Sequence, residues 1–180
     1  MKLSFFANIS NGDNMKYINE FFLYSVFGYI METLLYLFLK VKKQSGFLYL
    51  WWTPFYGTGV LISFYIYKVF NKKILNKVTR NILLFITYFL VFSILEYCGG
   101  IILEMIYGYA FWNYSKIPLH LGKYISVPTS LGWAVFAFVY VFVIKKYTDK
   151  MIKYIPEWLT KVLVVTFILD VIFSLIKVVI

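Results

Sequence analysis

The run that decides the fold is ILLFITYFLVFSILEYCGGIILEMIY, residues 82–107. An α-helix rises about 1.5 Å per residue, so about 20 apolar residues cross the roughly 30 Å hydrocarbon core of a bilayer. The run is longer than this and holds only two charged side chains, Glu96 and Glu104. It therefore predicts a transmembrane helix.

Four further stretches have the same character, namely 21–39, 54–70, 127–144 and 158–179. Pro54, Gly57 and Gly59 interrupt the start of the second, so we predict broken or re-entrant backbone between residues 46 and 59. Together the stretches predict an all-α, polytopic membrane helix bundle of about five transmembrane helices. Residues 20–180 are expected to form a single domain after a polar, irregular N-terminal segment, 1–19, that lacks the pattern of a signal peptide.

Composition supports a membrane location. Hydrophobic residues make up 62% of the 180-residue chain and charged residues 14%, whereas soluble domains have roughly 45–50% and about 25%. The net charge of +10 comes from short basic clusters between apolar runs, and no nucleic-acid-binding motif accompanies it. The expected partner is therefore the lipid bilayer and not nucleic acid.

The loops predict an orientation, because Lys and Arg are retained on the cytoplasmic side of a membrane. The N-terminus and the loops after the second and fourth stretches carry twelve of the 18 Lys and Arg residues, and the opposite side carries six. This distribution predicts a cytoplasmic N-terminus. The loop with Lys40, Lys42 and Lys43 is the exception.

Four acids interrupt the apolar stretches: Glu32, Glu96, Glu104 and Asp170. A charge at mid-membrane costs at least about 2.5–3.5 kcal/mol on insertion scales, and no Lys or Arg lies in the middle of any stretch. The acids fit a site for a proton, a cation or a cationic ligand, or protonated carboxyls that only hold helices together. The presence of four acids favours a polar cavity, where Glu96 and Glu104 could lie at two depths about 12 Å apart.

The loop 108–126 lies on the same predicted side as Glu104 and contains Trp112, Tyr114, His120 and Lys123. It fits either a lid over the cavity or an interfacial segment anchored by aromatic residues. Cys98 is the only cysteine, which excludes an intrachain disulfide. Motifs of soluble enzymes are absent, including the phosphate-binding loop of ATPases; no cofactor is predicted, and metal binding is left open.

Five local patterns resemble the putative ABC-transporter type IV family, small bacterial multi-pass permeases. They are Tyr24-Ser25 with Gly28-Tyr29 and Glu32; Gly46-Phe47-Leu48 with Pro54, Tyr56-Gly57 and Gly59; Glu96-Tyr97 with Gly100 and Glu104; Trp112-Asn113-Tyr114-Ser115; and Ser130-Leu131 with Trp133. Ser45 and Asn113 stand where the family pattern carries charged residues. The resemblance implies a permease in the bacterial inner membrane.

The favoured hypothesis is a permease-like protein that moves a small polar or cationic ligand, with a separate ATPase subunit or a homo-oligomer as possible partners. Its candidate ligand-binding residues are Glu32, Glu96, Tyr97, Glu104, Trp112, Tyr114, Lys123 and Asp170. One alternative is an intramembrane enzyme acting on a lipid or isoprenoid, with one carboxyl as general acid or base. The other is an assembly or signalling protein. An enzyme is the less favoured class.

Overall fold

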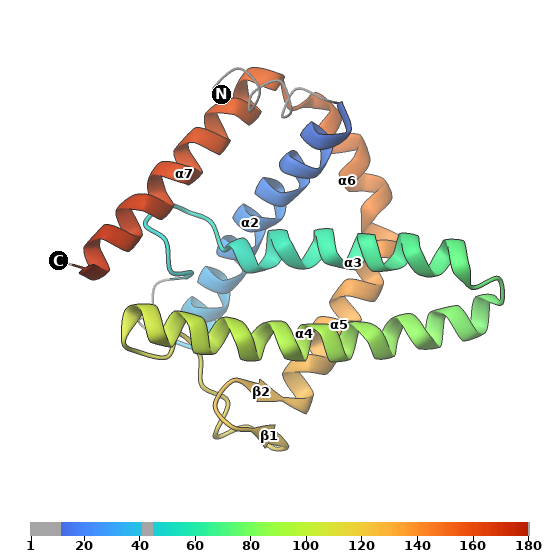
Figure 1. The fold of residues 1–180 in the computed structure, drawn as a ribbon, viewed down its shortest axis with the longest axis horizontal. Helices are drawn as coiled ribbons and strands as arrows, with labels where there is room; N and C mark the ends of the chain where they lie inside the picture. Colours follow the sequence, from blue (N-terminus) through green and yellow to red (C-terminus); the bar gives the residue numbers. More distant parts are fainter. Residues whose placement is uncertain (1–11, 41–44, 180) are drawn as a thin grey trace. The chain divides into compact units, whose positions relative to one another are not determined.

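The computed structural model describes residues 12–40 and 45–179, which form helices and the segments that connect them (Figure 1). The helices are α2 (Gly12–Phe38), α3 (Pro54–Lys73), α4 (Lys77–Tyr107), α5 (Val127–Val139), α6 (Lys145–Met151) and α7 (Glu157–Val179). A π-helical turn, Tyr140–Ile144, joins α5 to α6, and a 3-10 turn, Ile152–Tyr154, follows α6. The only strands in the described ranges are β1 (His120–Leu121) and β2 (Ile125–Ser126). The predicted helical fold class is confirmed.

Four helical stretches are long and apolar enough to cross a membrane in the described part of the chain. They are 14–38, 77–107, 127–154 and 157–178. Helix α3 forms as expected and is 20 residues long, yet it is not among these four. The interrupted second stretch therefore remains the least apolar of the five predicted helices.

The N-terminal prediction is partly outside the described residues, as are Lys42 and Lys43. Residues 1–11 of the expected irregular segment are not described, but residues 12–19 belong to α2. The helix thus begins well before the apolar run. One reason is visible at Asn19, which is buried and accepts a hydrogen bond of 2.6 Å from the Thr160 hydroxyl of α7. This polar contact gives the first turns of α2 a partner that hydropathy does not reveal.

The chain divides into two compact units, each described here by itself. Unit 1 comprises 12–40, 45–61 and 145–179 of the described residues, and unit 2 comprises 62–144. The core of unit 1 contains Phe22 of α2, Leu48 and Trp52. Phe167 of α7 packs edge-on against Phe22 and Trp52, with ring centroids 5.7 Å apart in both pairs. These aromatic contacts tie α2 and α7 to the connection before α3.

The connection before α3 is non-helical from Ser45 to Thr53, and the helix begins at Pro54. The predicted broken backbone over 46–59 is therefore too long at its C-terminal end. Proline is accommodated in the first turn of a helix because its missing N–H has no intrahelical partner there. Gly57 lies against the Phe21 carbonyl of α2, where an added Cβ would be only 2.4 Å away. Its small size permits a close helix contact.

Unit 2 is built on α4 and α5. Asn76 caps the start of α4 by accepting a hydrogen bond of 3.0 Å from the Thr79 amide. After α4 the chain forms the antiparallel pair β1 and β2. Ser126 then caps α5, again through a threonine amide, that of Thr129. Both caps satisfy backbone donors at a helix start.

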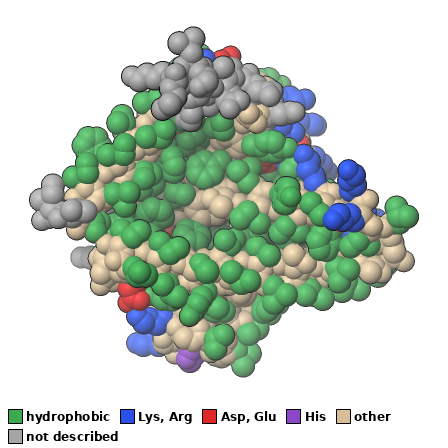
Figure 2. All heavy atoms as spheres, viewed as in Figure 1, with side chains coloured by type: hydrophobic (Ala, Val, Ile, Leu, Met, Phe, Trp, Pro, Cys, Tyr) green, Lys and Arg blue, Asp and Glu red, His purple; other side chains and the backbone are tan. Residues whose placement is uncertain are grey.

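Small polar side chains are buried in both units, and many large apolar side chains are exposed. Ser25, Ser63, Ser130 and Thr160 are fully buried, while α7 exposes residues such as Phe173, which is 62% exposed. Hydrophobic side chains cover much of the visible helix surfaces (Figure 2). Small residues between helices and apolar residues toward the surroundings are typical of helices in lipid.

Candidate functional site

The most polar buried arrangement in unit 2 surrounds Glu96. This residue lies on α4 and is 5% exposed. Its Oε1 accepts a hydrogen bond of 2.8 Å from the Tyr114 hydroxyl and one of 2.9 Å from the Trp133 indole N–H. Tyr114 comes from the loop after α4, and Trp133 comes from α5. Three segments thus meet at one carboxylate oxygen.

The other oxygen of this carboxyl, Oε2, is buried and has no hydrogen-bond partner among the described residues. The Thr129 hydroxyl faces the carboxyl from the first turn of α5, but it donates to the Ser126 carbonyl at 3.0 Å. An unpartnered buried oxygen is costly, and a buried anion without a counter-charge is more so. The position therefore suits a proton or a cation.

The sequence of α4 explains why Glu96 points inward. The buried residues of this helix are Leu84, Tyr88, Phe92, Glu96, Gly100 and Leu103. They recur every three or four positions and so lie on one face. On that face, the Phe92 ring stacks on Trp133 at 5.9 Å between centroids. The Ser93 hydroxyl donates to the Ser130 hydroxyl at 2.8 Å. The apolar stripe of α4 thereby carries Glu96 against α5.

Gly100, one turn after Glu96, receives the side chain of Tyr124. A Cβ built at Gly100 would lie 2.3 Å from the Tyr124 ring. Trp112 packs edge-on against the same ring, with centroids 6.1 Å apart. The loop after α4 therefore rests on the helix face that holds Glu96, and only glycine leaves room for it.

Glu104 is held differently from Glu96. Its two carboxylate oxygens accept hydrogen bonds from the Lys123 ammonium at 2.6 and 2.8 Å, and Oε2 also accepts one from the Tyr124 hydroxyl. Burial, together with the neighbouring carboxylate, raises the pKa of Tyr124 to about 12, so this phenol remains a donor at neutral pH. The loop lysine thus supplies the counter-charge of the Glu104 carboxylate.

The two remaining predicted acids belong to unit 1, and both bind the non-helical segment 45–53. Glu32 Oε2 accepts from the Ser45 hydroxyl at 2.7 Å and from the Gly46 amide at 3.3 Å. Asp170 is 4% exposed. It accepts from the amides of Tyr49 and Leu50, both at 3.1 Å, and from the Trp52 indole at 2.7 Å. Backbone donors in an irregular membrane segment need such partners.

The family model described as "Putative ABC-transporter type IV" matches residues 19–178, nearly the whole chain. The chain belongs to this family. No curated protein and no solved structure matches it. Membership in the type IV family, together with the long apolar helices, describes a multi-pass membrane protein that fits a transporter component.

Within this type IV family member, the structure brings some predicted site residues together. Glu96 lies with Tyr114, Glu104 lies with Lys123, and Trp112 joins the second group through Tyr124. Tyr97 is one residue along α4 from Glu96, which turns it by about 100°, and it is 44% exposed. Glu32 and Asp170 both bind the non-helical segment 45–53. A single cavity that collects acids from both units stays a prediction.

Several polar residues of the type IV chain were not predicted from the sequence to belong to the site. One is Trp133, which binds Glu96. It lies in one of the segments that resemble the family, and that resemblance is the signal that could have identified it. In unit 1, fully buried Glu20 pairs with Lys145 at 3.3 Å, and Asp149 pairs with Lys16 at 3.1 Å and with Lys145. These charges flank apolar runs, where a solvated position is the usual expectation.

The sequence alone does not decide whether the type IV chain binds a metal. Within 12–40 and 45–179, no three His, Cys, Asp or Glu side chains gather as a metal-binding group.

Proposed function

We propose that this chain is the membrane-spanning permease component of a transporter and that Glu96 binds a small cationic ligand. The observation that carries the proposal is the buried Oε2 of Glu96, which lacks a partner among the described residues. The carboxylate is preorganised, because Tyr114 and Trp133 fix its other oxygen. A cation would complete the arrangement.

The surroundings of Glu96 favour a cation over an anion. The carboxylate is negative when ionised, and its two hydrogen-bond donors, the Tyr114 hydroxyl and the Trp133 indole N–H, are neutral groups. Phe92 stacks on the Trp133 ring and adds an apolar wall. The negative charge is therefore available to a cation, whereas it would repel an anion. A proton on Glu96 would satisfy the same oxygen and would compete with the ligand.

The loop 108–126 supports a gated site. Tyr114 supplies a hydrogen bond to Glu96, and its amide donates to the Lys123 carbonyl at 2.7 Å. Lys123 in turn binds Glu104 on α4. Movement of the loop would therefore remove one donor from Glu96 and uncover it. These contacts favour a lid over a merely interfacial segment.

The charge distribution supports entry of the ligand from outside. With the N-terminus in the cytoplasm, as the lysine-rich loops favour, and with α3 crossing the membrane as the second of five helices, the loop 108–126 would face outward, and a ligand would reach Glu96 from that side. The sequence has no phosphate-binding loop. ATP hydrolysis would thus come from a separate subunit in the bacterial inner membrane.

The test is cation binding by the purified full chain, measured through tryptophan fluorescence at constant ionic strength. The probes are sodium, guanidinium and tetramethylammonium chlorides. We expect a saturable change for at least one probe, its loss in Glu96→Gln, and its retention in Glu157→Gln. Glu157 is a matched control, because it is an exposed acid paired with Lys161 at 2.7 Å.

Two outcomes contradict the proposal. One is the absence of a saturable response in the native chain, and the other is an unchanged response in Glu96→Gln. Turnover of a membrane lipid by the purified protein without any cation response would favour an intramembrane enzyme instead. If Glu96→Gln lost folded protein to the same extent as it lost the cation response, seen as aggregation in detergent, the carboxyl would have a structural role.

A further inference from the structure

Unit 1 contains a pocket between α7 and the non-helical segment 45–53, with a volume of about 650 Å³. Its apolar wall includes Leu169, Phe173 and Ile176 from α7 and Leu50 from the segment. The three side chains from α7 are 49%, 62% and 47% exposed, respectively. The pocket is thus open at the apolar surface of a helix that is long enough to span a membrane.

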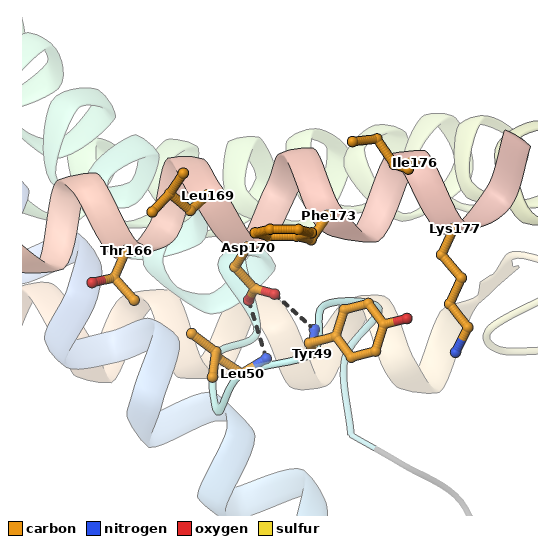
Figure 3. Close-up of a pocket in the computed structure, with 8 residues that line it drawn as sticks. All are labelled: Tyr49, Leu50, Thr166, Leu169, Asp170, Phe173, Ile176 and Lys177. Atoms are coloured by element: carbon orange, nitrogen blue, oxygen red, sulfur yellow. Dashed lines mark hydrogen bonds between the residues drawn. The ribbon is translucent and has the colours of Figure 1, made fainter. Parts of the chain in front are cut away.

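The polar groups of the pocket are distributed unevenly. Asp170 lies in the lining, but its carboxylate already accepts three hydrogen bonds from the segment 45–53. Lys177 is the only cationic residue in the described lining, and its ammonium lies 5.0 Å from the ring centre of Tyr49. Figure 3 shows Lys177 and Tyr49 at one end of the lining residues and Thr166 at the other.

The length of the pocket matches one leaflet of a bilayer. Lys177 is next to the end of the candidate span 157–178, where a lysine reaches the headgroup region. Thr166 lies eleven residues earlier, which is about 16 Å deeper along a helix. Half of a hydrocarbon core of roughly 30 Å is about 15 Å. An acyl chain entering beside Lys177 would therefore fill the pocket to its inner end.

We propose that this pocket binds an anionic phospholipid of the bilayer. The acyl chain lies against Leu169 and Phe173, and the headgroup phosphate accepts from the Lys177 ammonium beside the Tyr49 hydroxyl. The charge of Lys177 selects an anionic headgroup over a zwitterionic one. The site belongs to unit 1 and does not depend on ligand binding at Glu96.

The lipid would lie against Asp170 and against the two residues that donate their amides to it. Tyr49 and Leu50 line the pocket and also donate their amides to Asp170 (Figure 3). A bound acyl chain covers these amides from the lipid side. It thereby stabilises the non-helical segment against α7, which gives the site a physical role in holding unit 1 together.

The experiment uses the full chain in phosphatidylcholine vesicles that contain a phosphatidylglycerol with a photoreactive diazirine on its acyl chain. Trypsin cleaves after Lys161 and Lys177, so the pocket side of α7 falls in one peptide, 162–177. We expect labelling of this peptide, with unlabelled phosphatidylglycerol competing better than added phosphatidylcholine. Equal competition by the two lipids, or label found only in other peptides, overturns the proposal without any variant.

Variants test the headgroup and the acyl wall separately. A basic residue near an anionic surface contributes about 1 kcal/mol, so Lys177→Gln should reduce the preference for phosphatidylglycerol about fivefold, while Lys177→Arg keeps it. Leu169→Trp should fill the pocket and reduce labelling. Leu175→Trp is the matched control, because Leu175 is 42% exposed on the same helix and is not part of the lining. An unchanged preference in Lys177→Gln, or equal labelling of the two Trp variants, contradicts the proposal.

Discussion

The Trp133 indole donates a hydrogen bond of 2.9 Å to Glu96 Oε1, and the two residues are 37 positions apart on α5 and α4. This bond fixes the carboxylate from one side, while Tyr114 fixes it from the loop. An acid that would be costly on an isolated membrane helix is thereby held in one orientation. Because both donors bind Oε1, Oε2 is the oxygen of Glu96 that has no hydrogen-bond partner among the described residues.

Replacing Trp133 with phenylalanine should destabilise unit 2. Phenylalanine keeps an aromatic ring against Phe92 but removes the indole donor, and a hydrogen bond to a charged group contributes about 1.5–3 kcal/mol. We expect a lower midpoint of thermal unfolding in detergent. Trp158→Phe is the control, because Trp158 is 65% exposed at the start of α7. Equal midpoints for the two variants would show that the indole bond contributes nothing.

Replacing Asp170 with alanine should release the segment 45–53. Three donors would lose their acceptor, and each unsatisfied donor costs about 1–3 kcal/mol. We expect faster proteolysis between Ser45 and Thr53 and a lower unfolding midpoint. Asp170→Asn retains one side-chain oxygen and should lie between alanine and the native protein. An alanine variant as resistant to protease as the native chain would refute this role of Asp170.

Replacing Lys145 with methionine should be more harmful than the same change at Lys146. Lys145 is 5% exposed and neutralises fully buried Glu20, whereas Lys146 is exposed. Removing one partner of a buried ion pair costs about 3–5 kcal/mol. The unfolding midpoint in detergent measures the difference. The double change Lys145→Met with Glu20→Gln should recover part of the loss, because no buried charge is then left unpaired in this pair.

Replacing Gly100 with alanine should displace Tyr124, since the added Cβ would lie 2.3 Å from its ring. Tyr124 would withdraw from α4, and the loop 108–126 would become more accessible. Amide hydrogen exchange of residues 111–124 should therefore increase. Gly132→Ala on α5 is the control, because a Cβ added at Gly132 would meet nothing within 4 Å among the described residues. Unchanged exchange in Gly100→Ala would mean that the ring contact does not hold the loop.

Hydropathy predicted the helices well because it depends on local composition. Residues 82–107 exceed the length of a membrane span, and α4 extends over them. The start of α3 was less predictable, since Pro54 and Gly57 are compatible with a turn as well as with the first turns of a helix. The structure shows the helical alternative, in which Gly57 packs against α2.

The partners of the acids were not predictable from the sequence. Asp170 binds amides 121 and 120 positions away, and every residue except proline has such an amide. Lys145 lies at the end of an apolar run, where charge pattern favours a loop, but the helix continues and buries it. One sequence contains no information on which helix faces meet, so the chemical types were predictable and their pairings were not.

The hydrogen bonds of Asp170 can form only late in the synthesis of the chain. Tyr49 and Leu50 leave the ribosome some 120 residues before the carboxylate that accepts from their amides. Until α7 has emerged, the connection between α2 and α3 lacks its principal acceptor and is open to proteases. We therefore expect chains interrupted before residue 170 to be degraded faster than chains that contain α7, even though the other described helices have already been made.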